Sequence, residues 1–295
     1  MLGFIAGVTI LFGLPIARLR RPSPSLRLML NAIAVGVLVF LAWDVLSAAW
    51  NPIDAALGNF HSGDGGLAPA FGYGSLFAAG LIAGLLGLVA YERWMARTIT
   101  RADVPPDPGT SVEPPLRTGA GVAVREHPPA VKGLASWSPA RRLALLIAVG
   151  IGLHNFAEGL AIGQASASNQ IALATLLVIG FALHNATEGF GIVAPLSGET
   201  GRDGTRAVPS WGFLLTLGAI GGGPTFIGTA IGHTFTSDAL SVVFLTLAAG
   251  SILYVIIQLI TIAARTQRMD LLAYGVLIGV LAGFLTDAIV TAAGV

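Results

Sequence analysis

Eight long apolar runs dominate this 295-residue sequence, and they restrict its fold more than any other feature. Each run comes close to the roughly 17 to 25 residues that a helix needs to cross the hydrocarbon core of a bilayer. Inside that core the backbone has no water to bond, so a spanning segment must satisfy its polar groups internally, as a helix does. The runs cover roughly residues 1–18, 29–50, 70–94, 141–165, 170–195, 210–233, 238–264 and 271–294. The predicted fold class is therefore all-α, a polytopic membrane protein with eight transmembrane helices in a bundle.

The composition supports this prediction and excludes several classes of function. Hydrophobic residues make up 54% of the chain and charged residues only 11%, whereas soluble domains carry roughly 25% charged residues. The net charge of +1 gives no indication of nucleic-acid binding. The chain has no cysteine, which excludes disulfides, thiolate metal sites and cysteine nucleophiles. Any metal must therefore bind to His, Glu, Asp, Asn or backbone oxygen.

The connections between the runs indicate how the chain is divided. Residues 98–140 are rich in proline, glycine and charged residues and have little hydrophobic periodicity, which is typical of a disordered loop. This loop separates residues 1–97, with the first three helices, from residues 141–295, with the last five. By contrast, only the segment Ser166–Asn169 separates the fourth run from the fifth. So short a connection predicts a tight hairpin, with the two helices as antiparallel neighbours.

The basic residues predict the topology. All 16 Lys and Arg residues fall in or beside the first, third, fifth and seventh connections. Basic connections face the cytoplasm, so both termini are expected outside and the loop 98–140 inside, in a plasma (inner) membrane. The first run precedes its basic residues, which favours a first membrane helix over a cleaved signal peptide.

A motif that occurs twice inside the apolar runs carries the chemistry. The pattern His-Asn-x-x-Glu-Gly occupies residues 154–159 and returns at residues 184–189, so that His184 follows His154, and Glu188 follows Glu158, at a spacing of 30 residues. On a helix, residues i and i+4 share a face, so each motif directs an imidazole and a carboxylate the same way. A single His in an apolar helix is more often a hydrogen-bonded core residue. The repetition in phase favours a shared site instead.

Charge balance indicates what such a site would bind. Two carboxylates at membrane depth repel each other or take up protons unless a cation lies between them. A divalent ion bound by Glu158, Glu188 and two neutral imidazoles leaves zero formal charge. We therefore predict a metal site made of these two residues with His154 and His184. The neighbouring Asn155 and Asn185 point about 100° around each helix. They add oxygen ligands, begin a second weaker position, or form interhelical hydrogen bonds.

Further polar or irregular positions lie in other runs. The sequence Gly221-Gly222-Gly223-Pro224 predicts a kinked or broken sixth helix, either purely structural or exposing backbone carbonyls to an ion. Candidates for an ion path are Asp44, Gly223, Gln258 and Asp287. Glycines at four-residue spacing predict close helix packing in the third and last runs, at Gly80 and Gly84 and at Gly275, Gly279 and Gly283.

Taken together, these features resemble the Zrt/Irt-like (ZIP) family of divalent metal transporters, in its prokaryotic-type members. The resemblance rests on eight helices, external termini, a long loop after the third helix, and the paired motif. It implies that His154, Glu158, His184 and Glu188 form the primary metal site, and that Asn155 and Asn185 join the shared glutamates in an adjacent second site. It also implies import of zinc or a similar ion to the cytosol by an elevator-like movement of one helix bundle against another, commonly as a dimer.

The sequence departs from the family pattern at several positions. The family usually has proline before each motif glutamate, where this chain has Ala157 and Thr187. Its sixth helix commonly reads Glu-Pro where Gly223 and Pro224 stand, and its seventh commonly offers glutamate at Gln258. The histidine-rich loop of many members is also missing. These changes predict one principal metal site rather than an acidic pair of sites.

The expected function is thus transport of a divalent transition metal, zinc first and Fe, Mn, Co or Cd as further candidates. The metal ion is the substrate; no organic cofactor, nucleic acid or nucleotide hydrolysis is expected. The expected partners are membrane lipid and a second copy in a homodimer. The alternative is a membrane-embedded metalloenzyme, a metal-dependent hydrolase or oxidase that uses the same residues. Di-iron bundles use Glu-x-x-His, whereas this chain has His-x-x-x-Glu, which favours a transporter over an enzyme.

Overall fold

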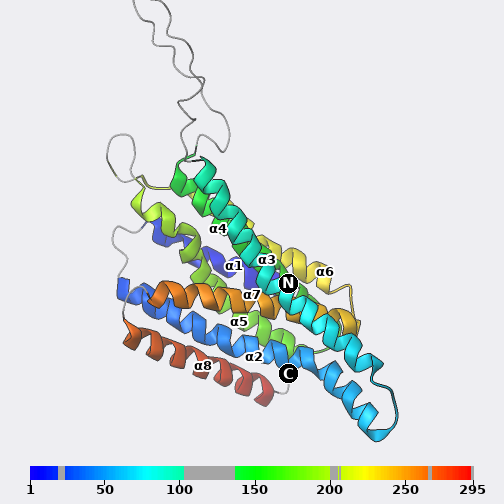
Figure 1. The fold of residues 1–295 in the computed structure, drawn as a ribbon. Coiled ribbons are helices and arrows are strands. Elements are labelled where there is room, and N and C mark those ends of the chain that lie inside the picture. The colour runs from blue at the N-terminus through cyan, green and yellow to red at the C-terminus, as the bar shows by residue number, and fades with distance from the viewer. Residues whose placement is uncertain (19–23, 103–136, 200–204, 206, 265–267, 294–295) are drawn as a thin grey trace, which may run out of the picture.

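The computed structural model describes residues 1–18, 24–102, 137–199, 205, 207–264 and 268–293, and the regular structure among them is helical throughout (Figure 1). Seven helices are long and apolar enough to cross a membrane. These are α2 (Pro24–Ser62), α3 (Ala68–Ala102), α4 (Pro139–Ala167), α5 (Ile171–Val193), α6 (Trp211–Gly232), α7 (Asp238–Ala264) and α8 (Met269–Ala292). The predicted all-α polytopic membrane fold is confirmed.

The first apolar run differs in form from the expected single helix. It begins with the short helix α1 (Leu2–Val8) and continues as the 3₁₀ segments η1 (Thr9–Phe12) and η2 (Leu14–Arg18). Together they make an eighth, shorter apolar segment, Leu2–Arg18. Because 3₁₀ helix is wound more tightly than α-helix, it directs side chains and carbonyls differently from a continuous α-helix.

The ends predicted for several helices were wrong. The second helix was expected to end near residue 50, but α2 continues through Pro52 to Ser62 and forms a long hairpin with α3 that projects beyond the other helices (Figure 1). The predicted loop 98–140 is also shorter, because α3 reaches Ala102 and α4 begins at Pro139. The predicted disorder itself concerns residues 103–136, which lie outside the described part of the chain.

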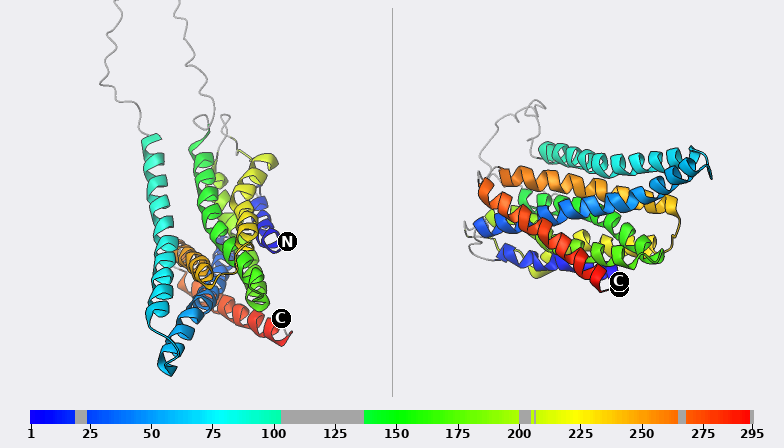
Figure 2. Two further views of the ribbon diagram at one scale, coloured as in Figure 1. Left: turned by 90° about the vertical axis from the view of Figure 1, so that its right-hand side faces the viewer. Right: turned by 90° about the horizontal axis from the view of Figure 1, so that it is seen from below.

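The helices form two blocks, which we call the motif block (α1, α4, α5 and α6 with their 3₁₀ segments) and the second block (α2, α3, α7 and α8). In each of the most extensive helix pairs, both helices belong to the same block. The pair α4–α6 lies in the motif block, and the second block contains α2–α8, α3–α7 and α2–α7. In the left view of Figure 2, α1, α4 and α6 gather on one side and α3 stands on the other.

Glycines explain why each block holds together. A Cβ added to Gly7, Gly159 or Gly228 would collide with main-chain atoms of another helix of the motif block. In the second block the same is true of the predicted packing glycines Gly84 and Gly279, which lie against the main chains of α7 and α2. Such close backbone approach requires glycine. Among the described residues, glycines at the boundary between the blocks meet side chains instead, Gly150 the Tyr91 ring and Gly180 the Leu41 side chain.

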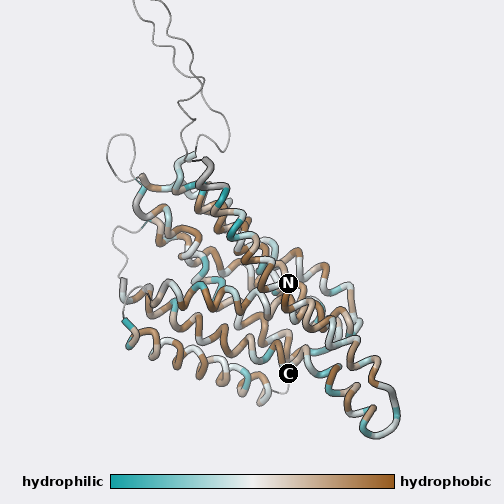
Figure 3. Tube along the Cα trace, in the orientation of Figure 1, coloured by the Kyte–Doolittle hydropathy of each residue, from teal (hydrophilic) through white to brown (hydrophobic). Residues whose placement is uncertain are grey.

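Hydrophobic residues predominate along the helices, and many hydrophilic ones lie toward the helix ends (Figure 3). Large side chains such as Phe71, Leu285 and Ile227 are more than half exposed. Exposed apolar area on this scale suits contact with lipid rather than water. The basic residues of the described chain, such as Arg18, Arg97 and Arg268, lie near the helix ends that adjoin the first, third and seventh connections.

Candidate metal centre

Helices α4 and α5 position the two motifs opposite each other. Helix α4 begins after Ser138, whose hydroxyl accepts a hydrogen bond from the Arg141 backbone N–H at 3.3 Å, with Pro139 at its first position. It ends at Ala167, and Asn169 turns the chain into α5 with a φ of 59°. Asn tolerates this left-handed conformation better than most residues. The predicted antiparallel hairpin is thus present, and it brings residues 154–159 beside residues 184–189.

The four predicted ligands meet between these helices. One ligand atom each from His154, Glu158 and His184 lies within 4.8 Å of the others. Nε2 of His184 lies 3.4 Å from Oε1 of Glu158 and 3.5 Å from Oε1 of Glu188. Nε2 of His154 lies 2.6 Å from the same oxygen of Glu188. All four residues therefore point into one volume.

These distances suit a small cation. Ligand atoms bonded at about 2.1 Å to a tetrahedral ion lie about 3.4 Å apart, and the separations of His184 from Glu158 and Glu188 match that spacing. The shorter contact between His154 and Glu188 has the length of a hydrogen bond. These two groups therefore have to separate somewhat to share an ion.

Burial makes the charges of this centre costly. Glu158 is 0% exposed, His184 1% and His154 3%, and the Glu188 side chain is 8% exposed. Both carboxylate oxygens of Glu158 lack a hydrogen-bond partner among the described residues. Within the same part of the chain, the ion pairs of Glu158 and Glu188 come from the two histidines and from no Lys or Arg. A buried carboxylate without a counter-charge is strongly unfavourable, so the donor set fits a bound cation.

The two asparagines are held by backbone carbonyls from other helices. Nδ2 of Asn155 donates to the Gly221 carbonyl of α6 at 2.9 Å, and Nδ2 of Asn185 donates to the Ala6 carbonyl of α1 at 3.0 Å. Oδ1 of Asn155 is buried without a hydrogen-bond partner in the described structure. Oδ1 of Asn185 lies 3.1 Å from Nε2 of His184. Because each amide nitrogen is bonded to a carbonyl, the amide oxygens are the atoms with which these side chains can bind a cation.

Helix α6 bears on the prediction made from Gly221-Gly222-Gly223-Pro224. The helix is continuous from Trp211 to Gly232 with Pro224 inside it, so of the two predicted forms, a kinked or a broken helix, the broken one is absent. A Cβ on Gly223 would meet no atom within 4 Å. The contact with the motifs comes from the carbonyl of Gly221 instead. The run of glycines was a signal for backbone exposure here, although it did not indicate which carbonyl takes part.

The remaining predicted pathway residues lie in the second block. Oδ2 of Asp44 in α2 is buried without a hydrogen-bond partner among the described residues, and Asp287 of α8 is close enough to act on it electrostatically. Nε2 of Gln258 in α7 donates to the Tyr254 hydroxyl at 2.6 Å, which in turn donates to Glu92 of α3 at 2.8 Å. These residues thus form two polar groups apart from the His/Glu centre.

Comparison with known protein families identifies a match over most of the chain. A family model described as "ZIP Zinc transporter" matches residues 1–290, almost the whole chain. A search of curated proteins found no match.

Proposed function

This chain belongs to the ZIP family of zinc transporters, and from that membership we propose that it carries zinc or a similar divalent ion to the cytosol through its His/Glu centre. Divalent metal transport is the activity of the family as a whole. Our proposal concerns the ion, the residues, the direction and the mechanism.

The observation that carries the proposal is the buried Glu158 carboxylate. Its two oxygens have no hydrogen-bond donor among the described residues, and His184 faces it at 3.4 Å. A divalent cation shared with Glu188 and the two histidines supplies the missing positive charge and leaves the centre neutral. Imidazole and carboxylate ligands suit zinc, and also iron, manganese, cobalt and cadmium. We propose that Asn155 and Asn185 contribute neutral oxygens to the same ion.

We propose that the ion passes between the two blocks. The basic ends of the helices face the cytoplasm by the positive-inside rule, which puts both termini outside and residues 98–140 inside. In that orientation Asp44 and Asp287 lie toward the outer half of α2 and α8, and Gln258 lies near the inner end of α7. They then line the path before and after the centre. Gly223 faces open space on α6 and leaves room beside that path.

The block structure supports an elevator-like mechanism. All four His and Glu ligands belong to the motif block, so a movement of this block relative to the second block carries the whole centre with it. Because ligands bind metal in their deprotonated form, protonation of a His or Glu favours release. Nucleotide hydrolysis takes no part in this mechanism. We further propose that the protein works as a homodimer in the plasma (inner) membrane.

The alternative, a membrane-embedded metalloenzyme, is disfavoured by the burial of the centre. Three of the ligands are no more than 3% exposed. A hydrolase or oxidase needs an open position next to its metal where a substrate can bind. In this conformation the four side chains of the centre are at most 8% exposed, which does not suit access by a substrate as large as a lipid.

Uptake into proteoliposomes that contain a metal-sensitive dye tests the proposal. We expect Glu158→Gln and His184→Ala to abolish zinc uptake and to weaken zinc binding to the purified protein. His61→Ala is a matched control, because His61 is exposed near the end of α2 and should leave both properties unchanged. Undiminished uptake by either centre variant would contradict the site. A competition series over Zn, Fe, Mn, Co, Ni and Cd then identifies the preferred ion.

A further inference from the structure

We propose that two hydrogen bonds between the blocks, one on each side of the metal centre along α4, hold the motif block in the register seen here and must break when the centre moves. The first joins Gln164 of α4 to Ser241 of α7, and the second joins Leu146 of α4 to Tyr91 of α3. This inference rests on the proposed transport function, because it assigns these contacts to the movement of the motif block.

The contact at Gln164 is buried, and both the oxygen and the nitrogen of the Gln164 amide are hydrogen-bonded. The Ser241 hydroxyl donates to Oε1 of Gln164 at 2.9 Å, and Nε2 of Gln164 donates to the Ser168 hydroxyl at 2.9 Å. Gln164 is 1% exposed and Ser241 6%. A buried amide oxygen that loses its donor has no water to replace it, so this hydrogen bond favours one relative position of α4 and α7.

The contact at Tyr91 lies toward the other end of α4. The Tyr91 hydroxyl donates to the backbone carbonyl of Leu146 at 2.6 Å. Its ring lies against Gly150, where an added Cβ would come within 2.8 Å of a ring carbon. The ring thus packs on Gly150, one helical turn away from the hydrogen bond. Any axial movement of α4 takes both Gly150 and the Leu146 carbonyl away from Tyr91.

The two contacts bracket the ligands of α4. Leu146 precedes His154 and Gln164 follows Glu158, so at about 1.5 Å of rise per residue the contacts lie roughly 27 Å apart along the helix axis. Two contacts this far apart resist both sliding and tilting of α4 against the second block. A shift of one helical turn, about 5.4 Å, separates both pairs.

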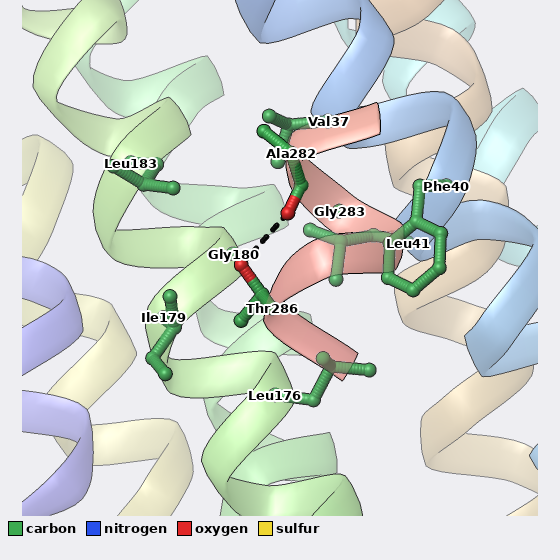
Figure 4. A pocket seen from close by; sticks show the side chains of 10 residues that line it. All are labelled: Val37, Phe40, Leu41, Leu176, Ile179, Gly180, Leu183, Ala282, Gly283 and Thr286. Carbon is green, nitrogen blue, oxygen red and sulfur yellow. Dashed lines mark hydrogen bonds between the residues drawn. The ribbon is translucent and has the colours of Figure 1, made fainter. Parts of the chain in front are cut away.

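The remaining contacts between the two blocks are apolar and do little to fix their relative position. A continuous apolar cluster crosses it, with the small side chains of Ala161 and Ala165 from α4 and larger groups from α2 and α7. Between α2, α5 and α8, Leu41 packs against Gly180 beside a small cavity, and the Thr286 hydroxyl there bonds within its own helix, to Ala282 (Figure 4). Apolar contacts of this kind are non-directional and can be exchanged for similar ones. The register therefore depends on the hydrogen bonds.

Electron–electron distance measurements between the blocks test the proposal. The chain has no natural cysteine, so spin labels can be placed at two introduced cysteines, Ile227→Cys in α6 and Leu86→Cys in α3, both of which are more than half exposed. Tyr91→Phe keeps the ring on Gly150 and removes only the hydroxyl, and Ser241→Ala removes the donor to Gln164. In each variant, we expect the population of molecules with the motif block displaced to rise about two- to tenfold relative to the population in the register seen here, in line with the loss of one hydrogen bond. In the double variant the two factors should multiply.

Matched controls exist for both substitutions. Ser251 lies in α7 like Ser241 and is also buried, but its hydroxyl bonds to Ala248 within the same helix. Tyr274 of α8 is 63% exposed. Ser251→Ala and Tyr274→Phe should leave the distance distribution unchanged. Zinc affinity, measured on the same samples, should be unaltered in all four variants, and this also shows that they are folded.

The outcomes separate this inference from the proposed function. If the distance distributions of Tyr91→Phe and Ser241→Ala equal those of the control variants while zinc binding is intact, the two hydrogen bonds do not set the register and the inference is wrong. Failure of the metal site would appear elsewhere, as unchanged binding in Glu158→Gln. Gln164→Leu gives an independent check, because it removes the acceptor instead of the donor and should shift the distances in the same direction as Ser241→Ala.

Discussion

Two glycines of α5 allow a sharp test of how the centre is held in place, because their surroundings are opposite. A Cβ on Gly189 would collide with the Ile10 carbonyl and lie 2.8 Å from Cα of Gly13 in the first apolar segment. A Cβ on Gly191 would meet no atom within 4 Å. Gly189 also directly follows the ligand Glu188. We predict that Gly189→Ala damages both stability and metal binding, and that Gly191→Ala damages neither.

The size of the effect follows from these contacts. Ordinary Cβ contacts begin at 3.4 Å, so α5 and the first apolar segment must separate by more than half an ångström to admit the Gly189→Ala methyl group. Main-chain atoms cannot yield as a flexible side chain does, and overpacking of this kind costs about 1–3 kcal/mol. Replacing helical Gly by Ala returns up to about 1 kcal/mol through helix propensity. Because the methyl group meets main-chain atoms, the upper end of that cost, about 3 kcal/mol, applies, and a return of about 1 kcal/mol leaves a loss of about 2 kcal/mol for Gly189→Ala. Gly191→Ala should gain up to about 1 kcal/mol.

Thermal unfolding and zinc binding of the purified variants in lipid nanodiscs measure the two consequences. Gly189→Ala should unfold at a lower temperature than the parent protein and bind zinc more weakly, because the displaced helix carries Glu188 and His184. Gly191→Ala should match or exceed the parent in unfolding temperature and keep its affinity. Equal behaviour of the two variants would refute the reasoning, since the same residue change in the same helix would then act without regard to the backbone contact.

Three further predictions concern the centre and its surroundings. Asn185→Ala should weaken zinc binding by about 10- to 100-fold, the usual effect of losing a group that supports a metal site, and calorimetric titration measures it. Zinc affinity should fall as the pH decreases, because the ligands His154, Glu158, His184 and Glu188 bind metal when deprotonated; a binding series across pH that stays flat would contradict this ligand set. Gln258→Leu should slow uptake without changing affinity, because Gln258 bonds to Tyr254 rather than to the centre; parallel flux and equilibrium-binding assays distinguish these quantities.

Much of the fold could be predicted from the sequence because hydropathy and charge act over whole segments. The apolar runs and the positions of the basic residues are sufficient for the number and order of the helices. Helix ends depend on local detail, and there the prediction was wrong at α2. The apolar run ends near residue 50, yet Pro52 just beyond it removes only one backbone donor, and the helix continues to Ser62. Near that proline, the Trp50 indole also donates to Asp54 at 2.9 Å, a bond between residues one turn apart.

The candidate centre was predictable as far as side chains define it. Spacing within each motif and the repeat between motifs place His154, Glu158, His184 and Glu188 together before any coordinates are known. The carbonyls of Ala6 and Gly221 could not be identified in this way, because every residue has a carbonyl and the sequence does not mark which one faces inward. Their positions depend on glycine contacts between α1, α4 and α6, at Gly7 and Gly159 for example. The glycines were visible in the sequence, but their partners were not.

These carbonyls bear on how many ions the centre holds. The amide nitrogens of Asn155 and Asn185 donate to these carbonyls, whereas an ionised carboxylate at either position would place oxygen against oxygen. The oxygens that remain for a cation are then neutral, and Gly223 adds no carboxylate beside them. Two glutamates offset the charge of one divalent ion, and a second ion in the same buried volume would carry two uncompensated charges. The helix contacts that orient the asparagines therefore favour a single divalent ion. Its two positive charges balance the two buried glutamates, and the neutral asparagine oxygens add no negative charge for a second ion.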